Sequence, residues 1–405
     1  MPATPVPLVI DTDPGVDDLL AIILALGSPE VSLEAITLSF GNTTLDYAYA
    51  NIQRIAHALK VTAKEGALNN TVLAERVEHG THGKPIRVAM GASKPLGGRM
   101  FTASYFHGRD GMSGVSFLPG NPFPCAESSA LFGSAPDPMP ADELLLDILK
   151  QHPPGTVRIA AVAPLTNLAL AFLKDPVTFR RVGMISVMGG ALDLPGNTSP
   201  VAEFNFFADP WAAKVLLEDA VKEGGYLPIS LFPLDVTTLH TLPYSKLVRD
   251  EHDALYQKST LVRLISHFLR KPRAVTNSFA PPGTPFDAAK YDLFEAHDPL
   301  AIAHCIFASA PHLEWKTAFR VFLLETDGTR TRGFCVVDRR NHGTPIEGQN
   351  KAELEERNGA HDEHGIEDTK TAIAAQDVPG ANVATTTPGA AWFAEMFLER
   401  LGMAT

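Results

Sequence analysis

The sequence predicts an α/β fold, in which an open, mostly parallel mixed sheet carries helices on both faces. Short runs rich in β-branched residues alternate with longer amphipathic segments, an order typical of βαβ units. Each informative cluster of polar residues follows directly after one of these strand-like runs. Ligands bind at the carboxyl edge of the strands in open α/β sheets, so we expect the active site at that edge.

The expected elements follow one another from the amino terminus. Gly27 and Pro29 should end the first helix, because neither residue continues a helix well. Strands are expected at residues 6–10, 31–40, 86–90, 157–162 and 184–188. Helices are expected at residues 19–26, 47–63, 164–172 and 390–401.

Three polar stretches interrupt this alternation. Residues 118–142 are rich in Pro, Ser and Gly and indicate a surface loop, and residues 277–287 indicate a similar loop that could act as a lid. Residues 341–389 indicate a flexible insertion before the last helix. The whole chain, 1–405, is therefore expected to form a single domain with one insertion.

Composition limits the class of protein. The chain has 405 residues, of which 45% are apolar, so it can bury a large core. The formal net charge of −12 argues against nucleic acid as a partner, since phosphates need a basic face. No targeting segment or membrane span is expected. Cys125, Cys305 and Cys335 are odd in number and far apart, which favours a reducing compartment, the cytoplasm.

Four aspartates follow the first expected strand within eight residues: Asp11, Asp13, Asp17 and Asp18. Carboxylates so close together repel one another, and burial raises that cost. A helix amino terminus offsets only part of the charge, so a bound cation is the natural remedy. Oxygen ligands favour Ca²⁺ or Mg²⁺. The alternative is that Asp17 caps a helix and that the Asp-Pro-Gly sequence forms an ordinary turn.

The run from Asp11 to Asp18 resembles the amino-terminal signature of the inosine–uridine nucleoside hydrolase family. Further motifs occur in the order that this family shows, and the resemblance extends over roughly residues 6–340 plus the last helix. These motifs are Phe40-Gly41-Asn42, His107-Gly108, Pro164-Leu165-Thr166-Asn167, Met188-Gly189-Gly190, Gly196-Asn197, Ala202-Glu203-Phe204-Asn205 and His297-Asp298-Pro299.

The resemblance implies an enzyme that hydrolyses the N-glycosidic bond of ribonucleosides to ribose and free nucleobase. Water activated by Ca²⁺, with an aspartate as general base, would carry out the attack. Uridine and inosine are the expected substrates, nicotinamide riboside remains open, and the role would be purine and pyrimidine salvage. A homodimer or homotetramer is expected.

The resemblance also implies a role for individual residues at the metal. The Ca²⁺ ligands would be the side chains of Asp13, Asp18 and Asp298 and the backbone carbonyl of Thr166. Asp13 would in addition be the general base. Asn42 would help to orient the ribose and the water, and Asp11 would steady the ligating carboxylates from behind.

Further residues are expected around the nucleoside. The 2′- and 3′-hydroxyls would bind Asp17 and Asn205, and the 5′-hydroxyl would bind Asn197 and Glu203. Met188 would pack beside the sugar. His107 and His297 would lie on the nucleobase side, with His297 as the candidate general acid for the leaving base.

The sequence departs from the family pattern around His107. Tyr105 stands where the family usually carries an aspartate, and Arg109 to Met112 replace a Ser-Gly-Leu sequence. These differences concern the nucleobase contacts rather than the ribose and metal site.

Two other functions remain open at this point. The first is a Mg²⁺-dependent phosphohydrolase of the haloacid-dehalogenase type, which would leave Glu203, Asn205 and Asp298 without a role. The second is a non-catalytic protein that binds nucleosides or ribose.

Overall fold

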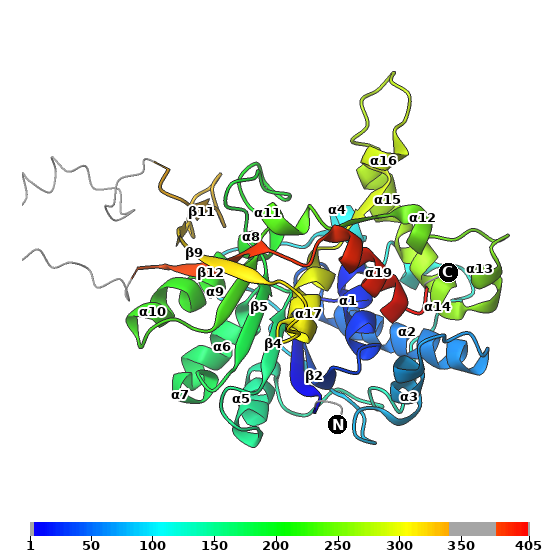
Figure 1. Ribbon diagram of the computed structural model, residues 1–405, viewed down its shortest axis with the longest axis horizontal. Helices are drawn as coiled ribbons and strands as arrows, with labels where there is room; N and C mark the ends of the chain where they lie inside the picture. Colours follow the sequence, from blue (N-terminus) through cyan, green and yellow to red (C-terminus); the bar gives the residue numbers. More distant parts are fainter. Residues whose placement is uncertain (1–3, 340–377, 404–405) are drawn as a thin grey trace, which may run out of the picture.

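One sheet of eight strands organises the molecule, and helices cover both of its faces (Figure 1). The structure, a computed structural model, describes residues 4–339 and 378–403. The strand order is β3-β2-β1-β4-β5-β6-β12-β9, and all neighbours are parallel except β12 and β9. The strands are β1 Val6–Thr12, β2 Val31–Leu38, β3 Arg87–Met90, β4 Arg158–Ala161, β5 Met184–Met188, β6 Ile229–Phe232, β9 Lys316–Val321 and β12 Gly380–Thr386.

Two short antiparallel ribbons lie outside this sheet. The ribbons pair β7 Thr241–Pro243 with β8 Leu293–Glu295, and β10 Leu323–Leu324 with β11 Cys335–Val336. The first of them matters for the site, because β8 leads directly into the helix that begins at His297.

The helices form two layers with separate apolar cores (Figure 1). One layer includes α1, α2, α14, α17 and α19, and the other includes α5, α6 and α9. The longer helices are α1 Val16–Leu26, α2 Leu45–Lys64, α3 Thr71–His79, α5 Ala141–Gln151, α6 Thr166–Lys174, α14 Thr260–Phe268, α15 Arg270–Asn277, α17 His297–Phe307 and α19 Ala390–Arg400. The short ones are α4 Ser104–His107, α7 Pro176–Phe179, α8 Phe204–Ala208, α9 Pro210–Lys214, α10 Ala220–Lys222, α11 Leu234–Thr237, α12 Tyr244–Leu247, α13 Ala254–Lys258 and α16 Ala288–Tyr291, with a 3₁₀ turn at Val115–Phe117 and a π-helical turn at Val215–Asp219.

Helix α1 is the central element of the larger core. All eleven of its residues are buried, and it packs against α17. A helix that is apolar nearly all round must be enclosed by protein, as α1 is. Its amino terminus, with Asp17 and Asp18 in the first turn, is consequently held in a fixed position at the edge of the sheet.

The predicted fold class and the five expected strands are confirmed, but the late part of the chain differs from the prediction. Residues 380–386, inside the stretch predicted as a flexible insertion, form β12 between β6 and β9. Residues 380–386 are therefore part of the sheet and not of a flexible insertion, and residues 340–377 lie outside the described part of the chain. Strand β12 escaped prediction because its small and polar residues carry no strong local strand signal.

The two loops predicted from composition are present, with one correction. The 118–142 stretch contributes Phe123, Leu131 and Phe132 to the core, so it is not wholly a surface loop. The 277–287 loop projects from the molecule between α15 and α16 (Figure 1) and leaves Phe279 and Phe286 largely exposed. Among the residues described, no helix combines the length and the apolar character that a membrane crossing requires.

Candidate active site

The predicted site residues gather at the carboxyl ends of four adjacent strands, β2, β1, β4 and β5. Asn42 follows β2, the aspartates follow β1, Thr166 follows β4 and Met188 ends β5. Parallel strands bring their carboxyl ends to one edge, so residues far apart in sequence meet there.

Asp18 closes the turn between β1 and α1. One of its carboxylate oxygens accepts hydrogen bonds from the Thr12 hydroxyl at 2.5 Å and the Asp13 N–H at 3.2 Å. The other accepts from the Gly15 N–H at 3.0 Å and the Asn42 side-chain amide at 2.8 Å. Four donors therefore hold this carboxylate in one orientation.

Asp13 is fixed through one oxygen only. Its Oδ2 accepts the backbone N–H of Asn42 at 2.5 Å, whereas Oδ1 is buried and has no hydrogen-bond partner. A Cβ atom on Gly41 would lie 1.9 Å from Asp13 Oδ2, so only glycine allows this close approach. The arrangement leaves one oxygen of Asp13 available to a group outside the chain.

Asp17, Asp18 and Asp298 form a buried trio whose ligand oxygens lie within 4.8 Å of one another. Asp298 lies in the first turn of α17. Burial first, and then the charges of neighbouring aspartates, raise the pKa of Asp298 and Asp13 well above the usual range and that of Asp17 to about 6. The chain itself therefore does not neutralise this cluster.

A hard divalent cation fits this set of residues. Carboxylate oxygens are the ligands that Ca²⁺ and Mg²⁺ prefer, and buried oxygens without partners, on Asp13 and Asp17, are free to interact with a cation. The trio differs in one member from the predicted ligand set, because it contains Asp17, predicted to bind ribose, rather than Asp13.

Asp11 lies behind the site and joins β1 to β2 and to the start of helix α6. Its Oδ1 accepts from the Thr37 hydroxyl at 2.6 Å and the Asn167 amide at 2.8 Å, and burial raises its pKa to about 7. It has no hydrogen bond to another aspartate in the described structure, so its support acts through β2 and the start of α6. Thr37 and Asn167 were not predicted as supporting residues.

Thr166 is anchored by a partner that the sequence did not indicate. Its hydroxyl donates to Asp209 at 2.7 Å, and the same carboxylate oxygen accepts the Leu96 N–H at 2.8 Å. Asp209 precedes α9 and was not among the predicted site residues. It fixes the first residue of α6, whose carbonyl was predicted to bind the metal.

A second group of polar residues lies beyond β5. The Asn205 amide donates to the carbonyls of Val162 at 3.0 Å and Met188 at 3.1 Å, so it joins the ends of β4 and β5. The Glu203 carboxylate is buried and accepts three backbone N–H groups, from Gly190, Asn205 and Phe206. Its pKa is raised, mainly by burial, although these donors act in the opposite direction.

Asn197 belongs to the same group. It is exposed, and its side-chain oxygen accepts the Phe204 N–H at 2.9 Å. The loop before α8 and the helix itself are therefore joined by side chains that were predicted to bind the 5′-hydroxyl.

His107 is held as a neutral ring. Its Nδ1 accepts the Val16 N–H at 3.2 Å and lies 3.9 Å from Asp17 Oδ1. Burial first, and then the positive charges of His297 and Lys271, lower the pKa of His107 to about 3. Because Nδ1 accepts a hydrogen bond, the ring proton belongs on Nε2.

His297 has the opposite electrostatic environment. Its Nδ1 lies 2.7 Å from the Thr237 hydroxyl and its Nε2 lies 3.2 Å from Glu295 Oε2. Burial lowers the pKa of His297, but the hydrogen bond and charge of Glu295, together with Asp17 and Glu203, outweigh it and raise the pKa above its usual value. The pKa values of the two histidines are thus shifted in opposite directions.

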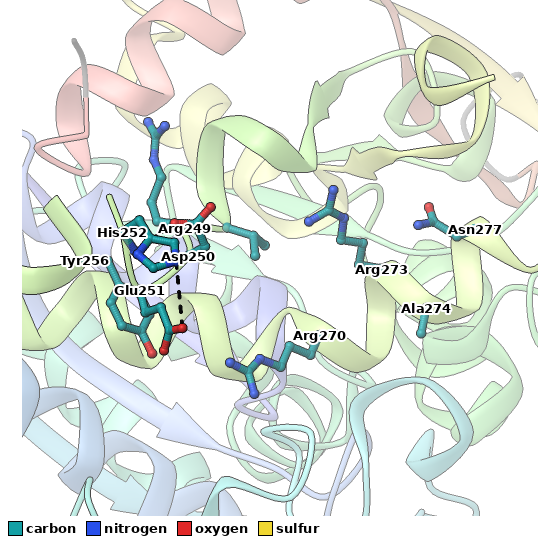
Figure 2. Close-up of a pocket in the computed structure, with 10 residues that line it drawn as sticks. Arg249, Asp250, Glu251, His252, Tyr256, Arg270, Arg273, Ala274 and Asn277 are labelled. Atoms are coloured by element: carbon teal, nitrogen blue, oxygen red, sulfur yellow. Dashed lines mark hydrogen bonds and ion pairs between the residues drawn. The ribbon is translucent and has the colours of Figure 1, made fainter. Parts of the chain in front are cut away.

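A surface hollow of about 590 Å³ lies apart from these residues, between the segment after α12 and helix α15 (Figure 2). None of the predicted site residues lines it. Arg273 in its wall is engaged by both oxygens of Asp292 at 2.6 Å, and Arg249 lies 3.6 Å from Asp253. The guanidinium groups of Arg249, Arg270 and Arg273 do not converge on one point in Figure 2.

Fold and site together are those of an α/β enzyme with a buried carboxylate cluster that could hold a metal at the edge of its sheet. The family model of inosine-uridine preferring nucleoside hydrolases matches residues 8–361. A pyrimidine-specific ribonucleoside hydrolase, RihA of Enterobacter sp. (strain 638), is 32% identical over 82% of this chain and 88% of its own length. An inosine-uridine preferring nucleoside hydrolase of Leishmania major is 30% identical over the same shares.

Solved structures show the same fold. A plant nucleoside hydrolase, PpNRh1, has a TM-score of 0.66 at 23% identity and covers 98% of this chain and 99% of its own. A purine-preferring ribonucleoside hydrolase from Gardnerella vaginalis has a TM-score of 0.68 at 21% identity, with 98% of each chain covered.

The chain therefore belongs to the inosine-uridine preferring nucleoside hydrolase family, and it is a nucleoside hydrolase. The expected enzyme class is confirmed. Neither alternative, the phosphohydrolase or the non-catalytic binding protein, is favoured by these comparisons.

Proposed function

We propose that this nucleoside hydrolase cleaves uridine and inosine, with Ca²⁺ as its metal ion and Asp13 as its general base. The observation that carries the proposal is the buried aspartate cluster after β1, where Asp13 and Asp17 each keep one oxygen without a partner. Polar groups on the adjacent strand ends would bind a sugar in this proposal, and a phosphohydrolase would leave them without a purpose.

The metal would be held by Asp13, Asp18 and Asp298 with the carbonyl of Thr166, and Asp17 would reach it as well as the ribose. When bound, the cation supplies a lowered pKa for a neighbouring water molecule and compensates the charge of the buried carboxylates. Ca²⁺ is the proposed ion because it accepts many oxygen ligands in an irregular arrangement.

Asp13 has the geometry of a base. The Asn42 N–H holds its Oδ2, so Oδ1 is left to take a proton from the attacking water. The Asn42 side chain holds Asp18 at the same time, and one residue thereby fixes the relative orientation of two carboxylates. Water adds to the anomeric carbon as the bond to the base breaks, and nearby carboxylates stabilise positive charge on the ribose.

The sugar would be held by hydrogen bonds from opposite sides. Asp17 and Asn205 would bind the 2′- and 3′-hydroxyls, and Asn197 and Glu203 would bind the 5′-hydroxyl, with Met188 beside the ring. Asn205 supports this role because the ends of β4 and β5 fix its amide group.

The leaving base would be protonated by His297, while neutral His107 would donate a hydrogen bond to the base through Nε2. Thr237 holds His297 Nδ1 and Glu295 lies 3.2 Å from Nε2, so proton delivery through Nε2 would require the contact with Glu295 to open. Subunits would assemble into a homodimer or homotetramer, which sedimentation would establish.

Release of free ribose from uridine, cytidine, inosine, adenosine and nicotinamide riboside tests the proposal. We expect ribose from uridine and inosine with Ca²⁺ and none after a chelator removes it. Ribose release that survives complete metal removal would contradict the metal assignment. Absence of ribose from all five nucleosides, with Ca²⁺ bound, would contradict the proposed activity.

A further inference from the structure

Tyr105 makes a contact that its place in the sequence does not explain. It lies in α4, two residues before His107, and its side chain is about half exposed. Its hydroxyl nevertheless lies 2.7 Å from the hydroxyl of Thr198, which is 93 residues further along the chain. An exposed hydroxyl can form its hydrogen bond with water instead of with protein. The direct contact with Thr198 therefore links two distant segments of the chain.

The segment that Tyr105 reaches is a tightly closed loop. The Thr198 and Ser199 N–H groups both donate to the Ala202 carbonyl at 3.3 Å, and the Ser199 hydroxyl accepts the Ala202 N–H at 3.0 Å. A Cβ on Gly196 would lie 2.1 Å from the Ala202 carbonyl oxygen, so only glycine lets the loop close. A hydrogen bond to Thr198 therefore positions the whole loop rather than one side chain.

Asn197 is the residue of this loop with a proposed role in binding. Its oxygen accepts the Phe204 N–H, so its amide N–H groups remain to donate to a ligand. The next polar group is the Glu203 carboxylate, and its charge, after burial, raises the pKa of the Tyr105 hydroxyl. Through Thr198, which follows Asn197 in the chain, Tyr105 contacts the loop that carries Asn197.

The other side of α4 is also anchored. Lys271 of α15 donates to the Ser104 carbonyl at 2.5 Å, so α4 is tied between α15 and the 196–202 loop. Because α4 carries His107 at its end, one short helix connects the nucleobase side of the site with its 5′ side.

We propose that Tyr105 and Thr198 form a positioning pair that holds Asn197 for the 5′-hydroxyl of the nucleoside, and so makes that hydroxyl a determinant of substrate choice. The inference rests on the proposed function, since it assigns the 5′ end of the ribose to Asn197 and Glu203. It also gives Tyr105 a role where the family resemblance places an aspartate.

The test compares each nucleoside with its 5′-deoxy analogue, which lacks the hydroxyl in question. Wild type, Tyr105→Phe, Thr198→Val and the double variant are assayed with uridine, 5′-deoxyuridine, inosine and 5′-deoxyinosine. Tyr256→Phe, in the wall of the hollow in Figure 2, is the matched control.

We expect Tyr105→Phe and Thr198→Val each to lower kcat/KM for uridine and inosine about five-fold, the size of one hydrogen bond. The 5′-deoxy analogues should change less than two-fold, and the double variant should be no worse than either single one. The change should appear mainly in KM, because the pair acts on binding rather than on the bond that breaks.

Equal losses on the hydroxylated and deoxygenated substrates would overturn the inference and leave the proposed function intact, and so would additive losses in the double variant. A wild-type enzyme that cleaves none of the four nucleosides would instead remove the proposed function, and the inference with it.

Discussion

Two loops of this protein bury carboxylates, but only one of them supplies hydrogen-bond donors to every buried carboxylate oxygen. In the 108–116 loop, Asp110 is fully buried and accepts backbone N–H groups from Met112 at 3.1 Å, Gly114 at 2.8 Å and Ser116 at 2.8 Å. In the turn after β1, Asp13 and Asp17 are as deeply placed, but each keeps an oxygen with no donor.

The contrast shows how a buried charge can reveal a binding site. The 108–116 loop supplies its own donors, so Asp110 fixes its shape and needs nothing from outside. The turn after β1 collects carboxylates that the chain does not neutralise, so a cation bound there would stabilise it. A buried oxygen that receives no hydrogen bond, rather than burial of the carboxylate itself, separates Asp13 and Asp17 from Asp110.

The largest effect is expected from Asp13→Asn. The new side chain still accepts the Asn42 N–H but does not act as a base, so ribose release should fall about 10³-fold. Asp46→Asn, an exposed acid in the first turn of α2, is the control and should be unchanged. Steady-state assays with uridine measure both, and an Asp13→Asn enzyme within ten-fold of wild type would refute the assignment.

The second largest effect is the increase in the free energy of unfolding when Ca²⁺ binds. Ca²⁺ at 100 times its dissociation constant should raise the free energy of unfolding by about 2.7 kcal/mol, because it binds only the folded chain. Asp298→Asn should abolish this gain. Urea unfolding with and without Ca²⁺ measures it, and calorimetry gives the affinity directly; an unchanged affinity in Asp298→Asn would show that this carboxylate is no ligand.

Without metal, the 108–116 loop and the cluster of Asp17, Asp18 and Asp298 should respond to loss of one acid with opposite signs. Asp110→Asn places an amide N–H against the Ser116 N–H and should cost about 2 kcal/mol of stability. Asp298→Asn removes one of several repelling charges and should leave the chain equally or more stable in chelator. If both variants destabilise equally, the distinction between the loops fails.

A smaller effect on stability is expected from the buried side chain of His304, whose surroundings favour the neutral ring. Its Nδ1 lies 2.7 Å from the Ser186 hydroxyl, and burial first, then the charge of Arg158, lower its pKa to about 4. The unfolded chain binds this proton near pH 6.5, so the stability from neutral His304 is complete above that pH and is lost as pH falls towards 4.

His304→Gln should therefore lose about 1.6 kcal/mol less stability than wild type between pH 6.5 and 5, as urea unfolding at each pH would measure. Parallel pH profiles for the two proteins would mean that this histidine binds its proton equally in both states.

The sequence predicted the parts of this structure that depend on neighbours along the chain. The strand ends, the aspartate turn and helix α1 follow from local patterns of apolar and polar residues, and the structure places them as expected. Asn42 and Asp298 were predicted only through the family resemblance, because an asparagine after a strand and an aspartate before a proline have ordinary local explanations.

The features that the sequence did not predict depend on contacts between segments that are far apart in the chain. Asp209 reaches Thr166 across 43 residues, and Thr37 reaches Asp11 across 26, so neither contact leaves a local signal. Strand β12 lies in the sheet through its pairing with β6 and β9, while its own sequence resembles a loop.

The position of β12 has a consequence for synthesis on the ribosome. Strand β9 pairs with β12 and not with β6, so residues 316–321 must wait for residues 380–386 to emerge before they join the sheet. Until then the edge of β6 is uncovered, and an uncovered edge strand is a template for pairing with another chain. A chain shortened before residue 380 would keep the aspartate turn but would leave the edge of β6 permanently exposed. We expect such a chain to aggregate although all the proposed site residues are still present.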